Sequence, residues 1–503
     1  MKKIVLTTLN ARYIHSAIGL RYLYANLKEF QEVTEIQEYV ITESTNEIAE
    51  KILRVSPEII GIGVYIWNAA EVSKLINVLK KISPETKIVL GGPEASHTPF
   101  RTDLSKADFI IQGEGDFEFY NLCKKIFSNE KINPTVIKAE IVDTEKLELP
   151  YKFYNDEDVS NRVMYVEASR GCPFTCEFCL SSIDKIVRTF DIEKLFTEFD
   201  KLWEKGARKF KFIDRTFNLN IKTTNKILDY FLDKEPPYLV HFEVIPEHFP
   251  ESLKEKIKKF PPASIQFEVG IQTLNPETAC EIKRTLDIKK IKENLHFLEN
   301  ETNAHLHVDL IIGLPGESIQ SFAENLNQLV SITKSEIQIG ILKKLSGTEI
   351  SRHDEKLGMV YSDVPPYDIL QNNLVSFAQM QKMKRFARFW DLTYNSGNFN
   401  KSVRLIWKDT DVFSGFYNFS EWLYNETLST YQISLNRLAE LLFKYLNEIK
   451  KIDKTETANI IVEDILKISG RKLPKFLREQ ATVIPETEKK NLDNINKRQI
   501  KHL

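Results

Sequence analysis

Residues Val163–Ser182 read VMYVEASRGCPFTCEFCLSS, and this stretch decides the fold. It joins a short apolar run, Val163–Ala168, to three cysteines, Cys172, Cys176 and Cys179, spaced Cys-x3-Cys-x2-Cys. Such short spacings let three thiolate sulfurs converge within one loop, as a cubane iron–sulfur cluster requires. Three protein ligands on a [4Fe–4S] cluster leave one iron open, and an open metal position can bind a substrate.

A zinc site is the alternative interpretation of the three cysteines. Zinc usually takes four protein ligands in a structural site, and the histidines nearest to the trio in sequence are His97 and His241. A disulfide framework is disfavoured as well, because the trio is odd in number and the N-terminus lacks a secretory signal pattern. The spacing therefore favours an iron–sulfur cluster.

Strand-like and helix-like stretches alternate downstream of Val163, which indicates a parallel sheet. Six such units in a row predict a parallel barrel or partial barrel whose reactive residues follow the strands. The expected helices include Ile192–Lys205, Ile221–Leu232, Pro250–Lys259 and Ile288–Glu299. The expected strands are Val163–Ala168, Lys209–Asp214, Leu239–Val244, Ser264–Gly270, His305–Ile312 and Glu336–Leu342.

The cysteine motif at the end of a first barrel strand resembles the radical S-adenosylmethionine superfamily over roughly residues 160 to 345. The resemblance implies that the open iron chelates the amino and carboxylate groups of S-adenosylmethionine. One electron, delivered from outside by flavodoxin or ferredoxin, then breaks a carbon–sulfur bond, and the radical formed abstracts a hydrogen atom from the substrate. Phe178 occupies a position that is usually aromatic in this family and lies near the adenine.

Polar residues at the other strand ends fit the same resemblance. Arg284 could pair with the methionine carboxylate, since a guanidinium forks onto carboxylates. The superfamily's Gly-Gly-Glu stretch is absent, and Asp214 or Thr216 could serve in its place. The stretch Gly313–Glu317 (GLPGE) resembles the turn that lies near the ribose and adenine. Glu243, Glu268, Gln272 and Asp309 complete the expected cofactor-binding residues, and a satisfied polar group of the barrel interior is the alternative for each.

Residues 1 to about 130 also alternate between strands and helices, which predicts a Rossmann-like parallel sheet with ligands at the carboxyl ends of its strands. Gly91 and Gly92 end the fourth expected strand, and Gly113 and Glu114 end the fifth. Together with the radical domain downstream, this segment resembles a cobalamin-binding domain. The resemblance implies that the nucleotide tail of cobalamin lies near these glycines. The expected strands are Ile4–Thr8, Glu35–Ile41, Ile59–Tyr65, Lys87–Leu90 and Phe109–Ile111, with helices at Ala17–Leu27 and Ala69–Lys81.

The sequence differs from many cobalamin proteins in the residues expected to ligate cobalt. The Asp-x-His-x-x-Gly motif, whose histidine ligates cobalt in many cobalamin proteins, is absent, and His15 is either a substitute or a locally hydrogen-bonded residue. A remnant domain without cofactor is the alternative for the whole segment. Methylthiotransferases need three further cysteines, and only Cys123 and Cys280 remain. We expect both of these to be buried as small hydrophobic residues.

The remaining segments are a connector at residues 131–160 and a helical C-terminal domain at 349–503, after the barrel at 161–348. Long helical periodicity covers Leu370–Trp390 and Ile433–Ile449, and aromatic residues gather there. We expect these aromatic residues to form the core of a helical domain, and a lid over the substrate is the alternative. The three-part layout resembles a group of uncharacterised bacterial cobalamin-type radical proteins.

Composition limits the classes of function. The chain has 503 residues, a net charge of −2 and no broad basic field, so nucleic acid is disfavoured as a partner. No apolar run is long enough to span a bilayer, and we expect a cytoplasmic protein. The resemblance implies an enzyme with a [4Fe–4S] cluster, S-adenosylmethionine and cobalamin that methylates an unactivated carbon of a small molecule or peptide. Radical rearrangement or cyclisation without methyl transfer is the alternative, and a cluster or cobalamin sensor is another.

Overall fold

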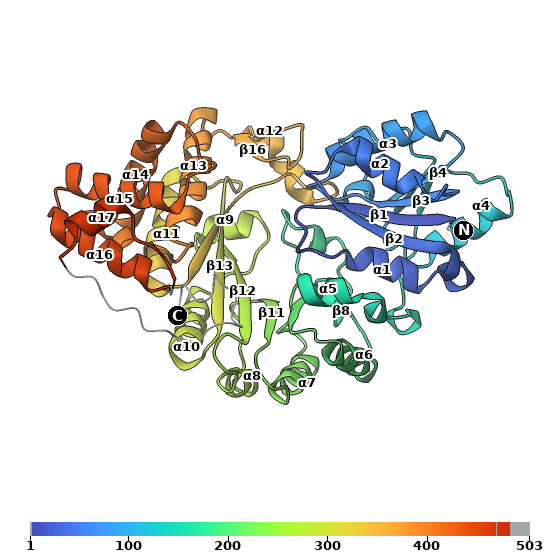
Figure 1. The fold of residues 1–503 in the computed structure, drawn as a ribbon, viewed down its shortest axis with the longest axis horizontal. Coiled ribbons are helices and arrows are strands. Elements are labelled where there is room, and N and C mark those ends of the chain that lie inside the picture. The colour runs from blue at the N-terminus through green and yellow to red at the C-terminus, as the bar shows by residue number, and fades with distance from the viewer. Residues whose placement is uncertain (1–2, 469, 483–503) are drawn as a thin grey trace.

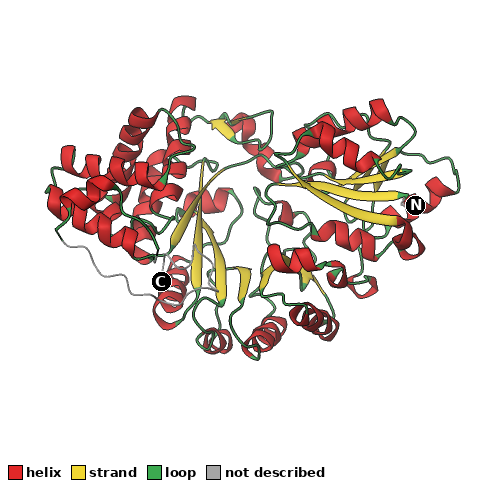
Figure 2. Ribbon diagram, viewed as in Figure 1, coloured by secondary structure: helices red, strands yellow, loops and turns green. Residues whose placement is uncertain are grey.

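The computed structural model describes residues 3–468 and 470–482, and it places three regions along the chain (Figures 1 and 2). An N-terminal α/β region, a central half-open α/β region and a C-terminal helical region follow one another in sequence. The predicted fold class is therefore confirmed. The last residues of the expected C-terminal domain, 483–503, lie outside the described residues.

The N-terminal region is a six-stranded parallel sheet in the order β2-β1-β3-β4-β5-β6. The central strand β1 is buried along its whole length, because helices cover both faces of the sheet. Strand order reverses next to β1, and such a reversal opens a crevice at the carboxyl ends of the strands. The elements are β1 (Ile4–Asn10), α1 (Ile18–Ala25), β2 (Thr34–Val40), α2 (Thr45–Leu53), β3 (Ile59–Gly63), α3 (Ala69–Ile82), β4 (Lys87–Gly91), β5 (Phe109–Gln112), α4 (Glu118–Phe127) and β6 (Val136–Lys138).

The interval expected to be a connector, 131–160, contributes β6 to this sheet. Val136 and Ile137 pack on opposite faces of the sheet, so even this short strand finds apolar partners on both sides. The helix α5 (Asp156–Asn161) follows, and a capping box between Asn155 and Asp158 starts it.

The central region is a partial barrel of six parallel strands in the order β14-β13-β12-β11-β10-β7. Side chains alternate along β11 and β13 between fully and partly buried positions, so one set packs under the helices and the other faces the barrel interior. The strands are β7 (Met164–Val166), β10 (Lys209–Phe212), β11 (Leu239–Val244), β12 (Ile265–Gln272), β13 (His305–Ile312) and β14 (Glu336–Ile341), with helices α6 (Ile192–Glu204), α7 (Ile221–Leu232), α8 (Glu251–Ile257), α9 (Pro276–Glu281), α10 (Ile288–Glu301) and α11 (Ile319–Ile332).

The C-terminal region packs aromatic side chains between helices, as its composition predicts. Trp390 stacks on Tyr394 with ring centroids 4.3 Å apart and meets Phe416 edge-on at 4.9 Å. Its helices are α12 (Asp354–Leu357), α13 (Phe377–Thr393), α14 (Val412–Thr427), α15 (Leu435–Glu448), α16 (Lys454–Leu466) and α17 (Lys475–Gln480).

The helix predicted from Leu370 begins later, at Phe377. A capping box between Ser376 and Gln379 sets its start. The residues before it form β16 (Ile369–Gln371), which pairs antiparallel with β15 (Val360–Tyr361), so the first part of that helix prediction was wrong.

The predicted burial of the two cysteines outside the cluster motif is confirmed for one and wrong for the other. Cys123 is fully buried on α4, as predicted. Cys280 is exposed, so its prediction as a buried residue was wrong, because the short helix α9 turns Thr278 and Ala279 inward instead. None of the described helices is both long and apolar enough to cross a bilayer.

Candidate functional site

The loop that carries the three cysteines leaves the barrel after β7 and is held by a small hairpin. Strand β8 (Ser169–Arg170) pairs with β9 (Arg188–Thr189) and closes the loop at its base. Gly171 has a φ of +89°, and a Cβ there would lie 2.2 Å from the carbonyl oxygen of Ile186. This position therefore requires glycine, which lets the loop turn directly before Cys172.

The three thiols fit a shared metal group. Cys172 and Cys176 are buried and Cys179 is partly buried. Burial raises the pKa of the Cys172 and Cys176 thiols, and negative charge on Cys179 raises both further. A cationic centre between these thiols would favour their ionisation. The residues present thus fit a cluster with three protein ligands.

A buried carboxylate anchors the cysteine loop to the C-terminal region. Glu177 lies between two of the cysteines and is 1 % exposed. Its oxygens accept from Arg352 Nε at 2.7 Å and lie 2.7 Å from His353 Nε2 and 2.9 Å from Lys283 Nζ. A buried charge is stable only when it is paired in this way. No local sequence pattern predicts this anchor, because all three partners lie more than 100 residues from Glu177 in the chain.

Arg284 lies beside the cysteine loop, as its expected role requires. Its Nη1 is 3.9 Å from Cys176 Sγ, and Nη2 donates to the carbonyl oxygen of Gly270 at the end of β12. Its Nε is buried without a hydrogen-bond partner among the described residues. The guanidinium therefore keeps a donor available next to the cysteines.

A cavity of about 330 Å³ brings together three of the predicted cofactor-binding residues, Phe178, Gln272 and Asp309. Its opposite wall is formed by β14 and the residues after it, from Gln338 to Leu345. Burial raises the pKa of Asp309 well above its usual range, and its Oδ1 has no hydrogen-bond partner among the described residues. An unpaired buried oxygen is costly unless a ligand satisfies it, so this cavity fits a polar ligand beside the cysteines.

The residues at the ends of β10 and β11 make contacts within the protein. Asp214 accepts from the Ala168 amide at 2.9 Å and from Ser169 Oγ at 2.6 Å, and burial raises its pKa to about 7. It holds the start of the cysteine loop against β10. Glu243 accepts from Arg215 at 2.7 Å, while the backbone carbonyl of Thr216 accepts from the Leu219 amide at 3.0 Å.

Glu268 lies deeper in the barrel than the cavity that Asp309 lines. His241 Nε2 is 2.9 Å and Lys211 Nζ is 3.5 Å from its Oε2. Burial works against ionisation, but the hydrogen bond with His241 and the charge of Lys211 outweigh it and lower the pKa of Glu268 to about 2. Glu268 is therefore a paired anion of the barrel interior.

The first and last residues of the GLPGE turn after β13 both pack against other parts of the protein. Gly313 has a φ of +88°, and a Cβ there would lie 2.7 Å from Ile369 of the C-terminal region. Glu317 is buried and accepts from Thr273 Oγ1 and Asn325 Nδ2, each at 2.7 Å. Burial raises the pKa of Glu317 to about 7.

A second cavity, of about 200 Å³, lies at the carboxyl ends of β3, β4 and β5 and is lined by glycines. Gly91 has no positive φ, and a Cβ built on it would meet nothing closer than 3.8 Å. The fold therefore does not require glycine at this position, and the missing side chain leaves space over the sheet. Gly115 is similar, with 3.5 Å to the nearest atom. Such a cradle fits the tail of a nucleotide-bearing cofactor. The predicted residues Gly91, Gly92, Gly113 and Glu114 all line it, with Gly19, Gly61, Gly63 and Gly115.

His15 does not line the glycine cavity. Its Nδ1 is 2.7 Å from the hydroxyl of Tyr165 on β7, and burial lowers the pKa of its ring. The ring of His15 is therefore hydrogen-bonded within the protein, but to a barrel residue 150 positions away and not to its sequence neighbours, as the alternative had it.

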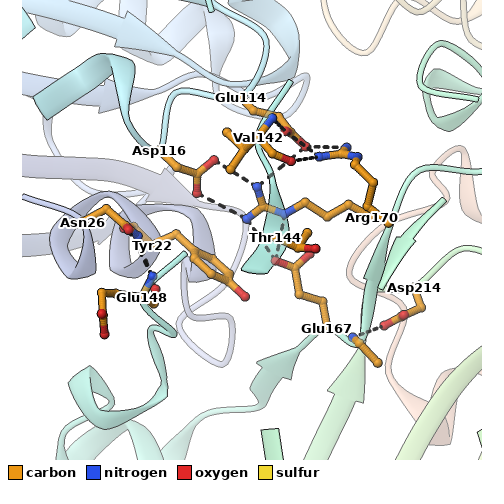
Figure 3. Close-up of polar contacts among 12 residues, drawn as sticks. Tyr22, Asn26, Glu114, Asp116, Val142, Thr144, Glu148, Glu167, Arg170 and Asp214 are labelled. Atoms are coloured by element: carbon orange, nitrogen blue, oxygen red, sulfur yellow. Dashed lines mark hydrogen bonds and ion pairs between the residues drawn. The ribbon is translucent and has the colours of Figure 1, made fainter. Parts of the chain in front are cut away.

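Arg170 lines the glycine cavity and lies two residues before Cys172, so it lies between the B12-binding region and the cysteine loop. Figure 3 shows it between carboxylates from both regions. Its guanidinium is 2.9 Å from Asp116, 3.0 Å from Glu167 and 3.6 Å from Glu114. Glu114 in turn accepts from both Nη atoms of Arg188 at 2.8 Å. The sequence did not reveal this network, since its members are up to 74 residues apart.

Three domain families match the chain, one for each region. The B12 binding domain matches residues 4–122 and the radical SAM superfamily matches residues 166–329. A protein family of unknown function, DUF4080, matches residues 355–502. The chain is a radical S-adenosylmethionine protein with a B12-binding domain. The first domain implies cobalamin, and the second implies a [4Fe–4S] cluster and S-adenosylmethionine.

Several curated proteins are similar to this radical SAM protein. An uncharacterised methyltransferase of Pyrococcus horikoshii is 27% identical over 41% of the chain and 50% of its own length. The anaerobic magnesium-protoporphyrin IX monomethyl ester cyclase of Cereibacter sphaeroides is 23% identical over 60% of the chain and 53% of its own length. The cobalamin-dependent radical SAM methyltransferase TokK of Streptomyces tokunonensis is 22% identical over 61% and 50%. The chain thus spans about half the length of the curated relatives it matches.

A solved structure with the same fold is the radical S-adenosylmethionine methyltransferase TsrM of Kitasatospora setae, with tryptophan and a S-adenosylmethionine analogue bound. The TM-score is 0.60 over 76% of the chain and 81% of TsrM, at 14% identity. A second TsrM structure, with cobalamin and a [4Fe–4S] cluster bound, has a TM-score of 0.58. The likeness confirms the arrangement of a B12-binding region beside a radical SAM barrel.

Proposed function

We propose that this protein is a cobalamin-dependent radical S-adenosylmethionine methyltransferase that methylates an unactivated carbon of a small-molecule or peptide substrate. The observation that carries the proposal is a pair of cavities at strand ends, one lined by glycines in the B12-binding region and one beside the cysteine loop. Arg170 lines the glycine cavity, and its chain neighbours lead directly into the cysteine loop. Two cofactors that meet at one substrate need their domains fixed relative to each other.

The residues of the chain have distinct roles in this proposal. Cys172, Cys176 and Cys179 hold the cluster, and the glycines at the ends of β4 and β5 accommodate cobalamin. When bound, the cluster supplies the electron that cleaves S-adenosylmethionine and cobalamin carries the methyl group. Arg284 offers its guanidinium to the carboxylate of S-adenosylmethionine. Asp309, whose pKa burial raises, offers its unpaired Oδ1 to a ligand of the neighbouring cavity.

The other candidate positions surround this site. Phe178 presents an apolar face to the same cavity as Gln272. Asp214, Thr216, Glu243 and Glu268 position the strand ends through the contacts described above. An external donor such as flavodoxin or ferredoxin would deliver the electron, and the protein would act in the cytoplasm.

Radical cyclisation without methyl transfer is the second candidate. The magnesium-protoporphyrin ester cyclase matches 60% of this chain, about as much as the methyltransferase TokK. Both reactions use the same cofactors, so the residues that hold them do not distinguish the two. The difference lies in whether the methyl group of S-adenosylmethionine is consumed.

The test is anaerobic reconstitution of the full chain with iron, sulfide and cobalamin, followed by S-adenosylmethionine with an isotopically labelled methyl group. We expect 5′-deoxyadenosine from radical cleavage and S-adenosylhomocysteine from methyl transfer. Cys176→Ala, the matched control, should yield no 5′-deoxyadenosine. Formation of 5′-deoxyadenosine without S-adenosylhomocysteine would exclude methyl transfer and favour cyclisation. Absence of both products from the reduced, cluster-loaded protein would contradict an enzymatic function and favour a sensor.

A further inference from the structure

Three side chains with metal-ligating atoms converge at the start of β13 and β14, the end of the barrel opposite the cysteine loop. His305 and His307 are two residues apart on β13 and therefore point to the same face of the sheet. Glu336, the first residue of β14, is the register partner of His307. The fold thus brings two imidazoles and one carboxylate side by side.

The distances among these three groups match the edges of a tetrahedral metal site. His305 Nε2 is 3.1 Å from His307 Nε2 and 3.2 Å from Glu336 Oε1. His307 Nε2 is 3.5 Å from the same oxygen. Zinc–nitrogen bonds of about 2.0–2.1 Å place tetrahedral ligand atoms roughly 3.3–3.4 Å apart. An octahedral site with similar bonds would need edges of about 3.0 Å, and two of the three distances are nearer the tetrahedral value.

The surroundings of His307 fit a metal ligand as well. Its Nδ1 is 2.8 Å from the side-chain amide of Gln338 and 3.2 Å from that of Gln266. The oxygen and nitrogen of a glutamine amide are assigned from their hydrogen-bond partners. With its oxygen turned to the ring, Gln338 accepts from Nδ1–H and leaves the lone pair of Nε2 for a metal, as outer partners of ligating histidines do.

We propose that His305, His307 and Glu336 bind a zinc ion that joins β13 to β14. The side chain of Glu336 is fully buried, and its Oε1 faces both imidazoles. Three protein ligands leave a fourth position for water from the adjoining cavity, which has a volume of about 730 Å³ and is lined by Glu336 and His305. This inference stands independently of the proposed function.

The site lies next to the contacts that dock the C-terminal region on the barrel. Strand β14 is the last strand of the barrel sheet in the described part of the chain. The C-terminal region docks on it through Asn395, whose side chain accepts from the Ile337 amide at 2.9 Å and donates to its carbonyl at 2.8 Å. Trp390 Nε1 donates to the same carbonyl at 3.1 Å. A zinc ion one residue away would clamp the strand that carries these contacts.

The test measures zinc bound to the tag-free, cluster-loaded full chain after anaerobic dialysis against micromolar zinc. We expect one zinc ion per chain by elemental analysis, and its loss in His307→Gln and Glu336→Gln. Gln338→Leu should weaken zinc affinity by roughly 10–100-fold, the usual effect of removing an outer partner. His241→Gln is the matched control, because it removes a barrel histidine that pairs with a different carboxylate, and its zinc content should equal that of the wild type.

X-ray absorption at the zinc edge keeps the proposal falsifiable if a variant fails to fold. We expect a nitrogen and oxygen shell at about 2.0–2.1 Å with imidazole scattering and no sulfur shell near 2.3 Å. A sulfur shell would place the zinc on the cysteines and overturn the proposal. So would a wild-type chain that binds no more zinc than Glu336→Gln, or one that binds iron at these residues in place of zinc.

Discussion

Replacing Arg170 by Met removes the cation at the junction between the B12-binding region and the cysteine loop (Figure 3). The side chain is 14% exposed, and its partners Glu167 and Asp116 are 6% and 7% exposed. Arg170 also lies over the ring of Tyr22, 4.7 Å from its centroid. Met keeps much of the apolar contact but leaves the carboxylates without their shared partner.

The expected loss of stability in Arg170→Met follows from the burial of the ion pairs that Arg170 forms. Removing one partner of a buried ion pair costs about 3–5 kcal/mol, because the remaining charge is left uncompensated. Burial already raises the pKa of Glu167, so this carboxyl can take up a proton when the arginine is lost. We therefore expect the lower end of the range, about 3 kcal/mol. Arg170→Lys should fall between the wild type and Met, since an ammonium keeps the charge but cannot fork onto two carboxylates.

Urea titration of the loaded protein measures this loss through two signals, the cobalamin absorption for the N-terminal region and the cluster absorption for the barrel. Arg170→Met should lower the midpoint of both transitions, since the network joins both regions. Arg437→Met is the matched control, because Arg437 and Glu440 form an exposed pair at 2.8 Å, with side chains 46% and 54% exposed. Exposed pairs contribute under about 1 kcal/mol. Equal midpoints for the two variants would refute the reasoning.

Three further predictions concern single positions. Burial raises the pKa of Glu317 from 4.5 to about 7, so the folded state binds a proton that the unfolded state releases between these values. Stability therefore falls by about 3 kcal/mol as pH rises from below 4.5 to above 7. Glu317→Gln should unfold at higher urea than the wild type at pH 8 and at nearly the same urea at pH 4; a difference independent of pH would contradict this. Cys176→Ala should lose the cluster absorption band, and a persistent band would exclude it as a ligand. Gly91→Ala should retain the cluster but bind cobalamin at least about tenfold more weakly, because its Cβ enters the cavity and meets no protein atom closer than 3.8 Å; unchanged binding would place cobalamin elsewhere.

Most of the fold could be predicted because its signals are local. The alternation of strands and helices gave both parallel sheets, and the cysteine spacing marked the loop after the first barrel strand. The short strand β6 was missed because three residues carry little periodicity, and only contacts on both faces of the sheet define it. The hairpin β15–β16 was missed for the same reason, since its residues continue the apolar pattern of the following helix.

The site could be predicted in part. Phe178, Gln272 and Asp309 share one cavity, and the glycines at the ends of β4 and β5 share another, since strand ends of a parallel sheet meet at one edge. Charge networks across regions could not be predicted. Arg170, Glu167 and Asp116 are ordinary charged residues in sequence, and only the packing of two regions makes their pairing visible.

The charged junction also explains why the cysteine loop needs two anchors. Arg170 ties the start of the loop to the B12-binding region, and Glu177 ties its middle to Arg352 and His353 of the C-terminal region. A loop of this length without regular structure would otherwise sample many conformations, at a cost of about 1–2 kcal/mol for each residue fixed. Because each anchor pairs a buried carboxylate, each favours a single geometry over nearby alternatives more than it adds net stability. The three regions therefore meet at the cysteine loop, and the C-terminal region helps to fix the geometry of the site through its contacts with Glu177.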